Sequence, residues 1–177
     1  EEWQSYLNTR QVQQFNVVQW VPTQWICVPD GDPDGDRAFE GHDKIHIYPR
    51  LFQKLDQKVD MMNVAGLLSA PVMAWAAEWG TEDVMSVNPG LTLPEDQVIL
   101  LEKYMVARWG ATAVVWIING DGYYVGKTAE RWKRIGRAVF GQRPHAPVTL
   151  HPCGVNLFLD EFRDEEWLDI IGYQCGD

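Results

Sequence analysis

Residues 113–122 read AVVWIINGDG, an apolar run that ends in a polar turn. An apolar run of this length without alternating polar residues is typical of a strand inside a parallel sheet, where both faces are covered. The run ends at Asn119, and Asp121 follows between two glycines. The stretch therefore predicts a buried parallel strand that carries a carboxylate at its carboxyl end.

Helical and extended patterns alternate on both sides of this strand. Before it, the sequence predicts a helix over residues 3–14, a strand over 15–21, a polar loop over 29–48, a helix over 49–66, a strand over 67–76, and a helix over 92–110 that opens with capping-box spacing from Thr92 to Glu95. After it, the sequence predicts a helix over 127–140, a strand over 147–151, a short helix over 164–168 and a strand over 170–174. This alternation is typical of an α/β fold with a parallel sheet.

Two architectures share this pattern, an open doubly wound sheet and a (β/α)₈ TIM barrel. A doubly wound nucleotide-binding sheet would carry a Gly-rich phosphate turn, and the chain contains neither G-x-G-x-x-G nor a P-loop motif. In a barrel, the side chains for chemistry sit at the carboxyl ends of several strands. Polar or aromatic side chains follow all five predicted strands: Gln19 and Trp20, Glu78 and Trp79, Asn119 and Asp121, His151, and Gln174. The sequence therefore favours a partial barrel.

Asp121 is the leading candidate for catalysis. A carboxylic acid at the mouth of a barrel is not needed for packing, and it could protonate the oxygen of a leaving group. The flanking Gly120 and Gly122 give the backbone freedom to turn and let a ligand approach closely. The alternative is a turn aspartate, because Gly-Asp-Gly is also ordinary turn chemistry.

Other polar side chains at strand ends are candidates for contacts with a sugar. Gln19, Asn119 and Gln174 are amides that both donate and accept hydrogen bonds, as sugar hydroxyls require. Glu78 is either a substrate ligand or a solvated loop acid. His151 is either a substrate contact or a capped core histidine. We expect this group to bind substrate around the catalytic carboxylate.

Nine tryptophans are an unusual number for 177 residues. A flat apolar ring can stack on a sugar, although most of the tryptophans are expected to lie in the core. Trp20, Trp79 and Trp116 are the candidates for stacking or for the wall of a carbohydrate cleft, because they lie in or just after predicted strands.

Composition narrows the class of protein. The length suits one domain, and 46% hydrophobic and 23% charged residues are typical of a globular chain. A net charge of −10 opposes binding to nucleic acid or to an anionic membrane, so neither partner is expected. The apolar runs are too short to span a bilayer, and no signal peptide is visible. The sequence predicts no oligomeric state.

No metal or other cofactor is expected. Residues 30–36 read DGDPDGD, but an EF-hand needs Glu eleven residues after its first Asp, and Gly41 stands at that position. Cys27, Cys153 and Cys175 are widely spaced and form no C-x-x-C pair, so neither a zinc site nor a disulfide framework is indicated. A barrel hydrolase that acts through a metal is a further alternative, but no H-x-H pair occurs at the strand ends.

Five segments follow the order found in a known family. They are FNVVQWV (15–21), LPEDQVILLEKYMVARWGATAVVWIINGDG (93–122), AERWKRIGRAVFG (129–141), VTLHP (148–152) and DEFRDEEWLDIIGYQCG (160–176). Together they resemble the apiosidase-like catalytic domains, which comprise glycoside hydrolase family 140 and its relatives. The resemblance implies a (β/α)₈ barrel that cleaves glycosidic bonds in plant or algal polysaccharide side chains, and it favours a secreted or periplasmic location.

The same resemblance implies that Asp121 is the catalytic acid/base residue. The chain departs from the family pattern in two places. Residues 119–120 read NG where the family usually has two glycines, and residues 175–177 read CGD where it usually has Ser-Gly-His. Both departures concern substrate contacts more than the fold.

The matched region corresponds to barrel strands two to six, so residues 1–177 are expected to form a single incomplete domain without strand one and strands seven and eight. Retaining glycosidases use two carboxylates. The resemblance implies that the second, a glutamate nucleophile, lies on a later strand beyond Asp177. Because a barrel needs roughly 200 residues or more, we expect the chain alone to be inactive and marginally stable. The alternative function is a carbohydrate-binding barrel that has lost catalysis.

Overall fold

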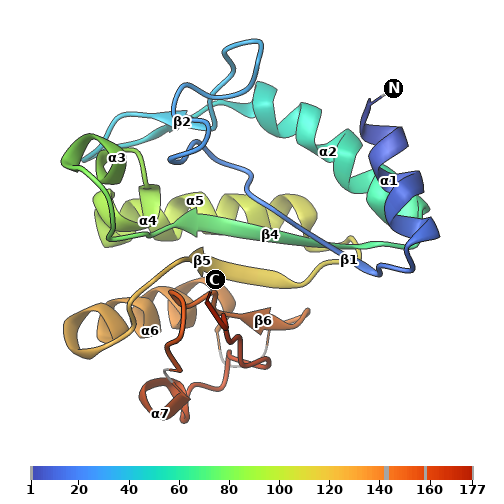
Figure 1. The fold of residues 1–177 in the computed structure, drawn as a ribbon. Helices are drawn as coiled ribbons and strands as arrows, with labels where there is room; N and C mark the ends of the chain where they lie inside the picture. Colours follow the sequence, from blue (N-terminus) through green and yellow to red (C-terminus); the bar gives the residue numbers. More distant parts are fainter. Residues whose placement is uncertain (1, 142–143, 158, 177) are drawn as a thin grey trace.

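The computed structural model describes residues 2–141, 144–157 and 159–176. Asp177, one of the residues in which the chain departs from the family pattern, lies outside these ranges. Four parallel strands form the central sheet: β1 (Val17–Trp20), β4 (Leu68–Trp75), β5 (Trp116–Gly120) and β6 (Val148–Thr149). Figure 1 shows them side by side, in their order along the chain. A doubly wound sheet reverses its order at a switch point, whereas a barrel adds its strands in one direction. The unbroken order agrees with the predicted partial barrel.

Helices connect these strands. They are α1 (Glu2–Val12), α2 (Pro49–Val64), α3 (Glu82–Ser86), α4 (Pro89–Thr92), α5 (Glu95–Trp109), α6 (Gly126–Phe140) and α7 (Leu159–Phe162). An antiparallel pair, β2 (Phe39–Glu40) and β3 (His46–Ile47), forms a small hairpin inside the loop predicted over residues 29–48. This hairpin was not predicted, because each strand is only two residues long, which is too short for a periodic pattern.

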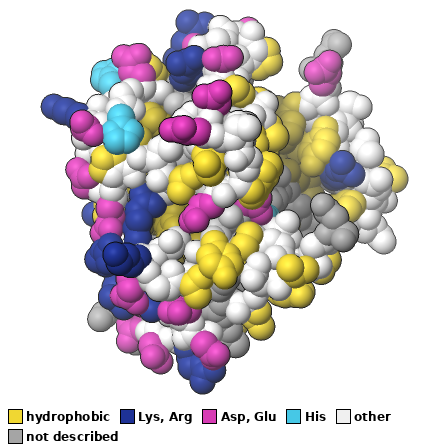
Figure 2. All heavy atoms as spheres, turned by 60° about the vertical axis from the view of Figure 1, so that its left-hand side comes forward, with side chains coloured by type: hydrophobic (Ala, Val, Ile, Leu, Met, Phe, Trp, Pro, Cys, Tyr) yellow, Lys and Arg dark blue, Asp and Glu magenta, His cyan; other side chains and the backbone are white. Residues whose placement is uncertain are grey.

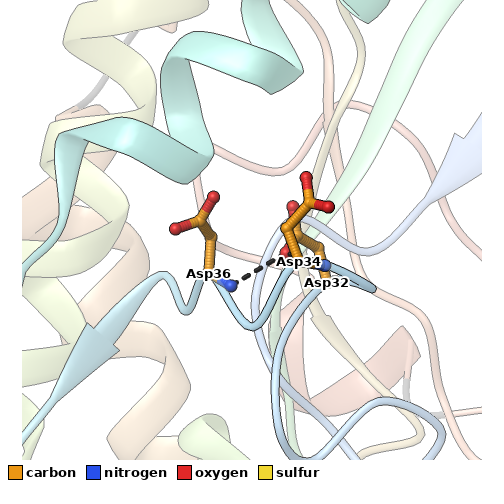
Figure 3. Close-up of side chains that lie close together, drawn as sticks. All are labelled: Asp32, Asp34 and Asp36. Carbon is orange, nitrogen blue, oxygen red and sulfur yellow. Dashed lines mark hydrogen bonds between the residues drawn. The ribbon is translucent and has the colours of Figure 1, made fainter.

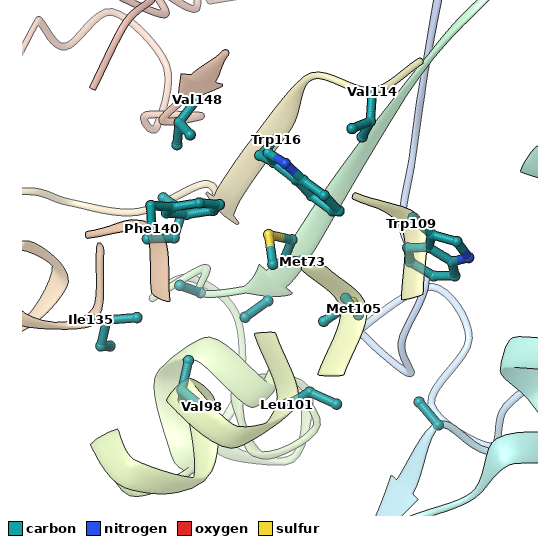
Figure 4. Packing of buried hydrophobic residues seen from close by; sticks show 14 of the residues in the cluster. Met73, Val98, Leu101, Met105, Trp109, Val114, Trp116, Ile135, Phe140 and Val148 are labelled. Atoms are coloured by element: carbon teal, nitrogen blue, oxygen red, sulfur yellow. The ribbon is translucent and has the colours of Figure 1, made fainter. Parts of the chain in front are cut away.

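The helices pack on one face of the sheet. A large buried cluster joins apolar residues of α2, α5 and α6 to the strands. Figure 4 shows part of it, with Met73 and Trp116 of the sheet near Leu101 and Met105 of α5 and Phe140 at the end of α6. The opposite face carries a smaller cluster that contains strand residues and residues of the segment after β1, but no helix residue. One-sided helical cover is the arrangement of a barrel wall, whose uncovered face looks inward.

Trp116 belongs to the large cluster and is fully buried. The prediction that it lines a carbohydrate cleft is therefore wrong. Neighbouring residues of a strand face opposite sides of the sheet. Trp116 and Ile118 belong to the cluster on the helix side, and Ile117 between them belongs to the cluster on the other side.

Two predicted elements near the end of the chain differ in the structure. The helix predicted over residues 164–168 is wrong, since α7 ends at Phe162 and turns follow it. Those turns let the buried Glu165 and Trp167 reach the core, where the indole nitrogen of Trp167 donates to the Glu165 carboxylate over 2.8 Å. The strand predicted over residues 170–174 contributes only one parallel bridge, between Thr149 and Ile170.

The predicted capping box is also wrong. Thr92 lies in α4, and its hydroxyl donates to the carbonyl of Asn88 over 3.0 Å. Pro94 is the residue before α5, and no side chain caps that helix. The spacing from Thr92 to Glu95 matches the motif, but Thr92 is the last residue of the separate short helix α4 and so does not cap α5.

Candidate active site

Asp121 lies just after β5 in an unusual backbone conformation. Its φ is +57°, in the left-handed region that aspartate tolerates better than most residues. The flanking glycines serve a different purpose from the predicted one. A Cβ atom on Gly120 would lie 2.2 Å from the ring of Trp75, and one on Gly122 would lie 2.4 Å from the ring of Tyr124. The glycines therefore make room for aromatic rings, while Asp121 itself makes the turn.

Two side chains from other loops reach the Asp121 carboxylate. The indole nitrogen of Trp79 donates to Oδ2 over 2.9 Å. In the amide orientation that pairs donor with acceptor, Gln174 donates to Oδ1 over 3.1 Å and to the carbonyl of Pro152 over 2.8 Å. The Asp121 side chain is 13% exposed, so it remains open to a ligand on one side.

His151 supports the backbone at the same place. Its Nδ1 accepts the backbone N–H of Asp121 over 3.3 Å and lies 3.8 Å from Oδ1. Accepting this hydrogen bond assigns the proton of a neutral imidazole to Nε2. The imidazole ring also lies 5.6 Å from the ring of Trp75, which in turn packs 4.4 Å from Trp25. Trp75 and Trp25 form an aromatic wall that the sequence analysis did not assign to the site.

Asn119 lies beneath the site rather than on its surface. Its side chain is fully buried, and its Oδ1 accepts the hydroxyl of Tyr124. That hydroxyl also lies 3.1 Å from the carbonyl of His151. Burial raises the pKa of Tyr124 well above its usual value, so the phenol stays a neutral donor. Tyr124 thus ties the end of β5 to the end of the next strand, a link between residues that no local sequence pattern reveals.

The other three predicted substrate residues, Gln19, Trp20 and Glu78, lie in three different places. Gln19 lines an open cavity of about 330 Å³ together with His151 and Gln174, on the face of the sheet without helices. Trp20 points to the opposite face, where its indole nitrogen donates to Ser69 over 2.9 Å and its ring packs 5.3 Å from Trp109.

Glu78 lines a separate cavity of about 240 Å³ with Thr128 and Arg131. The structure therefore gathers Trp79, His151 and Gln174 around Asp121, places Gln19 in the adjoining cavity, and does not bring Trp20 or Glu78 to the carboxylate.

An acidic cluster lies in the loop between β1 and β2. Figure 3 shows the side chains of Asp32, Asp34 and Asp36 projecting to the same side of the loop, and one carboxylate oxygen of each lies within 4.8 Å of the others. The ammonium group of Lys54 from α2 lies 2.7, 2.6 and 2.5 Å from these three carboxylates. Lys54 therefore offsets part of the negative charge of the cluster, and the guanidinium group of Arg50 adds a second ion pair to Asp36 at 3.1 Å.

These contacts shift the pKa values of Asp32 and Lys54. Burial opposes ionisation of Asp32, but hydrogen bonds from Lys54 and from the backbone of Asp36 and Asp34 outweigh it and lower its pKa. The hydrogen bonds to Asp32, Asp34 and Asp36 raise the pKa of Lys54. A polar loop was predicted here, but no local sequence pattern identifies a lysine from a distant helix as the partner of its aspartates.

Charges of both signs lie on the face of the molecule that Figure 2 draws. On the face drawn in Figure 2, acidic side chains are interspersed with Lys and Arg and with apolar side chains. An uncharged ligand such as a sugar needs no field of one sign, unlike a phosphate backbone. Among the described residues, no helix is long and apolar enough to cross a membrane.

Comparison with known proteins identifies the kind of domain. A family model described as "Apiosidase-like, catalytic domain" matches residues 1–177. The chain is similar to the crystal structure of a glycoside hydrolase family 5 protein from Bacteroides vulgatus, with 20% identity, a TM-score of 0.78, and coverage of 99% of this chain and 37% of that chain. A structure named "Glycoside hydrolase" has 19% identity, a TM-score of 0.79, and coverage of 99% and 38%.

A putative glycoside hydrolase from Bacteroides vulgatus has 19% identity and a TM-score of 0.62, with coverage of 86% of this chain and 32% of that one. Comparison with curated proteins gave no match. At these identities, the structural likeness shows the fold, which is part of a glycoside hydrolase-type (β/α)₈ barrel. The chain spans between 32% and 38% of the length of these three proteins.

Proposed function

The chain belongs to the apiosidase-like catalytic domain family, and from this premise we propose that it carries the acid/base half of a glycoside hydrolase active site, with Asp121 as the acid/base residue. One observation supports the proposal most directly. Asp121 stands at the carboxyl end of β5, and side chains from three other loops converge on it. An ordinary turn aspartate needs no such set of partners.

The chemistry follows from a carboxyl group that gives and then takes back one proton. In a retaining mechanism, Asp121 protonates the glycosidic oxygen while a second carboxylate attacks the anomeric carbon and forms a covalent glycosyl intermediate. Asp121 then deprotonates the water that releases the sugar. We propose that the second carboxylate is a glutamate on a later strand of the barrel. The described acids include no partner for this role beside Asp121, since Glu78 lines a different cavity.

The proposed substrate is a side chain of a plant or algal polysaccharide. The cavity beside Asp121 is lined in part by Gln19, His151 and Gln174, whose hydrogen-bonding side chains suit sugar hydroxyls. Trp79 is an exposed residue next to the carboxylate (53%), so its ring can offer a flat apolar surface to a sugar ring. Contacts of substrate with Trp20, Glu78 and Asn119 stay predictions.

The decisive experiment replaces the carboxylate in the full-length protein. We expect Asp121→Asn to lower kcat on glycosides with poor leaving groups by roughly 10²- to 10⁴-fold, because the proton donor is lost. The matched control is Asp164→Asn, which changes an exposed turn aspartate. If Asp121→Asn keeps nearly full activity, Asp121 is not the acid/base residue.

A second variant tests the retaining mechanism. With Asp121→Ala and an activated aryl glycoside, added azide should restore turnover and give a glycosyl azide of retained configuration, because a small anion can enter the space left by the carboxylate and attack the intermediate. A product of inverted configuration would contradict retention. Tight binding of a glycan by the unaltered protein without any hydrolysis would instead support the carbohydrate-binding alternative.

A further inference from the structure

The two oxygens of the Asp121 carboxylate have separate donors. Oδ2 accepts the indole N–H of Trp79 at 2.9 Å, and Oδ1 accepts the amide N–H of Gln174 at 3.1 Å. Gln174 is itself fixed, because the same amide group donates to the carbonyl of Pro152 at 2.8 Å. An aspartate carboxyl group otherwise rotates over a broad range about its last bond. One donor on each oxygen removes that freedom.

His151 does not perform this task. Its Nδ1 accepts the backbone N–H of Asp121, so the same nitrogen of a neutral ring has no proton to offer to Oδ1, from which it lies 3.8 Å away. His151 therefore orients the backbone of Asp121, and the orientation of the carboxyl group falls to Trp79 and Gln174.

The exposure of Trp79 also needs an explanation. Trp79 is exposed, whereas the other described tryptophans are buried or partly buried. The hydrogen bond from the indole nitrogen to Asp121 therefore anchors a residue that is otherwise largely exposed.

We propose that Trp79 and Gln174 are positioning residues, which hold the carboxyl group of Asp121 in the orientation for proton transfer to the leaving group. The inference rests on the proposed role of Asp121. It assigns to Trp79 a function that depends on its N–H group, in addition to any stacking by its ring. It also gives Gln174 a role that does not require contact with the sugar.

A misaligned acid affects some substrates more than others. A poor leaving group needs its proton during bond cleavage, whereas a highly acidic phenol leaves without one. Loss of a positioning contact should therefore reduce turnover in proportion to the basicity of the leaving group. Loss of a sugar contact or of local packing would reduce turnover on all leaving groups alike.

The test compares three variants of the full-length protein on aryl glycosides with leaving groups of graded acidity. Trp79→Phe keeps a ring but removes the N–H group, and Gln174→Leu removes the amide. Trp3→Phe is the matched control, because the indole nitrogen of Trp3 is buried and has no partner among the described residues. We expect Trp79→Phe and Gln174→Leu to lower kcat/KM, which reports cleavage of the glycosidic bond, by about 10- to 100-fold on the poorest leaving group and to leave kcat/KM of the most activated substrate within about twofold.

Thermal unfolding of each variant shows whether the protein is still folded. Equal losses across the whole leaving-group series, or no loss at all, would overturn the inference. A rise in KM at constant kcat would also overturn it, because that result assigns Trp79 and Gln174 to sugar binding alone.

The outcome for Asp121→Asn separates the two proposals. If Asp121→Asn abolishes activity on poor leaving groups and Trp79→Phe shows no dependence on the leaving group, only the positioning role fails. If Asp121→Asn itself remains active, the proposed function fails first.

Discussion

The ring of Trp75 lies directly against Gly120, where a Cβ atom would come within 2.2 Å of Cε3. Trp75 ends β4 and Gly120 ends β5, so the contact locks two neighbouring strands at the point where Asp121 follows. The position of the proposed acid therefore depends on a glycine that leaves room for a ring.

Gly120→Ala should destabilise the protein by about 1–3 kcal/mol, because the added methyl group forces the Trp75 ring or the backbone to move. Urea unfolding would measure the loss. The matched control is Gly35→Ala, which has φ +80° and no atom within 4 Å of its Cβ position, so it should cost only the backbone strain of about 1–2 kcal/mol. An unfolding midpoint for Gly120→Ala equal to that of the unaltered protein would show that the ring is not held there.

The parallel sheet could be predicted from the sequence because its signals are local. The apolar run over residues 113–118 marks β5, and the alternation of helices and strands follows from periodicity and length. The polar strand ends also predicted a group of substrate-binding side chains at one edge of the sheet, because the carboxyl ends of parallel strands lie there. Of that group, the structure brings Trp79, His151 and Gln174 to the Asp121 carboxylate.

What could not be predicted depends on contacts between distant residues. Whether Trp116 faces the helices or the cleft depends on the register of β5, which the apolar run does not reveal. Likewise, Lys54 is found opposite three aspartates only once α2 has packed beside the loop. The turns after α7 form because Glu165 and Trp167 find partners in the core, and this tertiary contact overrides the weak helical pattern.

Glu102 should lower stability at neutral pH. Its carboxylate is fully buried on α5 and has no hydrogen-bond partner among the described residues. Burial raises its pKa well above the usual value, against the opposing influence of Arg131. The folded state therefore favours the protonated acid. The stability of the fold with Glu102 protonated is fully present below about pH 4.3, the pKa of an unfolded glutamate, and part of it is lost as the pH rises toward the raised pKa of the folded state.

We expect Glu102→Gln to be more stable than the unaltered protein at pH 8 by roughly 1–3 kcal/mol, because an amide avoids the buried charge. The gain should shrink toward pH 5, which denaturant unfolding at both pH values would measure. Glu166→Gln is the control, since Glu166 is exposed. A pH-independent difference between Glu102→Gln and the unaltered protein would contradict the assignment.

Lys54→Gln should loosen the loop that carries the acidic cluster. Without the ammonium group, Asp32, Asp34 and Asp36 repel one another, and the melting temperature at pH 7 should fall. The lowered pKa of Asp32 means that its ion pairing stabilises the fold above about pH 3.9 and is lost as the pH falls below it. The difference between variant and unaltered protein should therefore narrow in acid and in high salt.

The control for this loss of charge is Lys44→Gln, which removes an exposed lysine from the β2–β3 turn. Thermal unfolding with limited proteolysis of the loop would compare the two variants. Equal effects of Lys54→Gln and Lys44→Gln would show that net charge, and not the cluster, is responsible.

Glu165 links the segment that leads to Gln174 with α6. Its carboxylate accepts two hydrogen bonds from Arg137, at 2.9 and 2.6 Å, and one from the indole nitrogen of Trp167 at 2.8 Å. Glu165→Ala should cost roughly 2–3 kcal/mol, because the buried indole N–H loses its acceptor while the half-exposed Arg137 can turn to solvent.

Glu165→Gln should cost less than Glu165→Ala, since its amide oxygen still accepts from Trp167. Denaturant unfolding would rank the two variants against Glu166→Ala, which truncates the exposed neighbour. In the full-length protein, Glu165→Ala should also weaken turnover of glycosides with poor leaving groups, because it loosens the segment that carries Gln174 to the Asp121 carboxylate. A large loss of stability with no change in leaving-group dependence would show that Gln174 is held in place by its own contact with Pro152 and not by the anchor at Glu165.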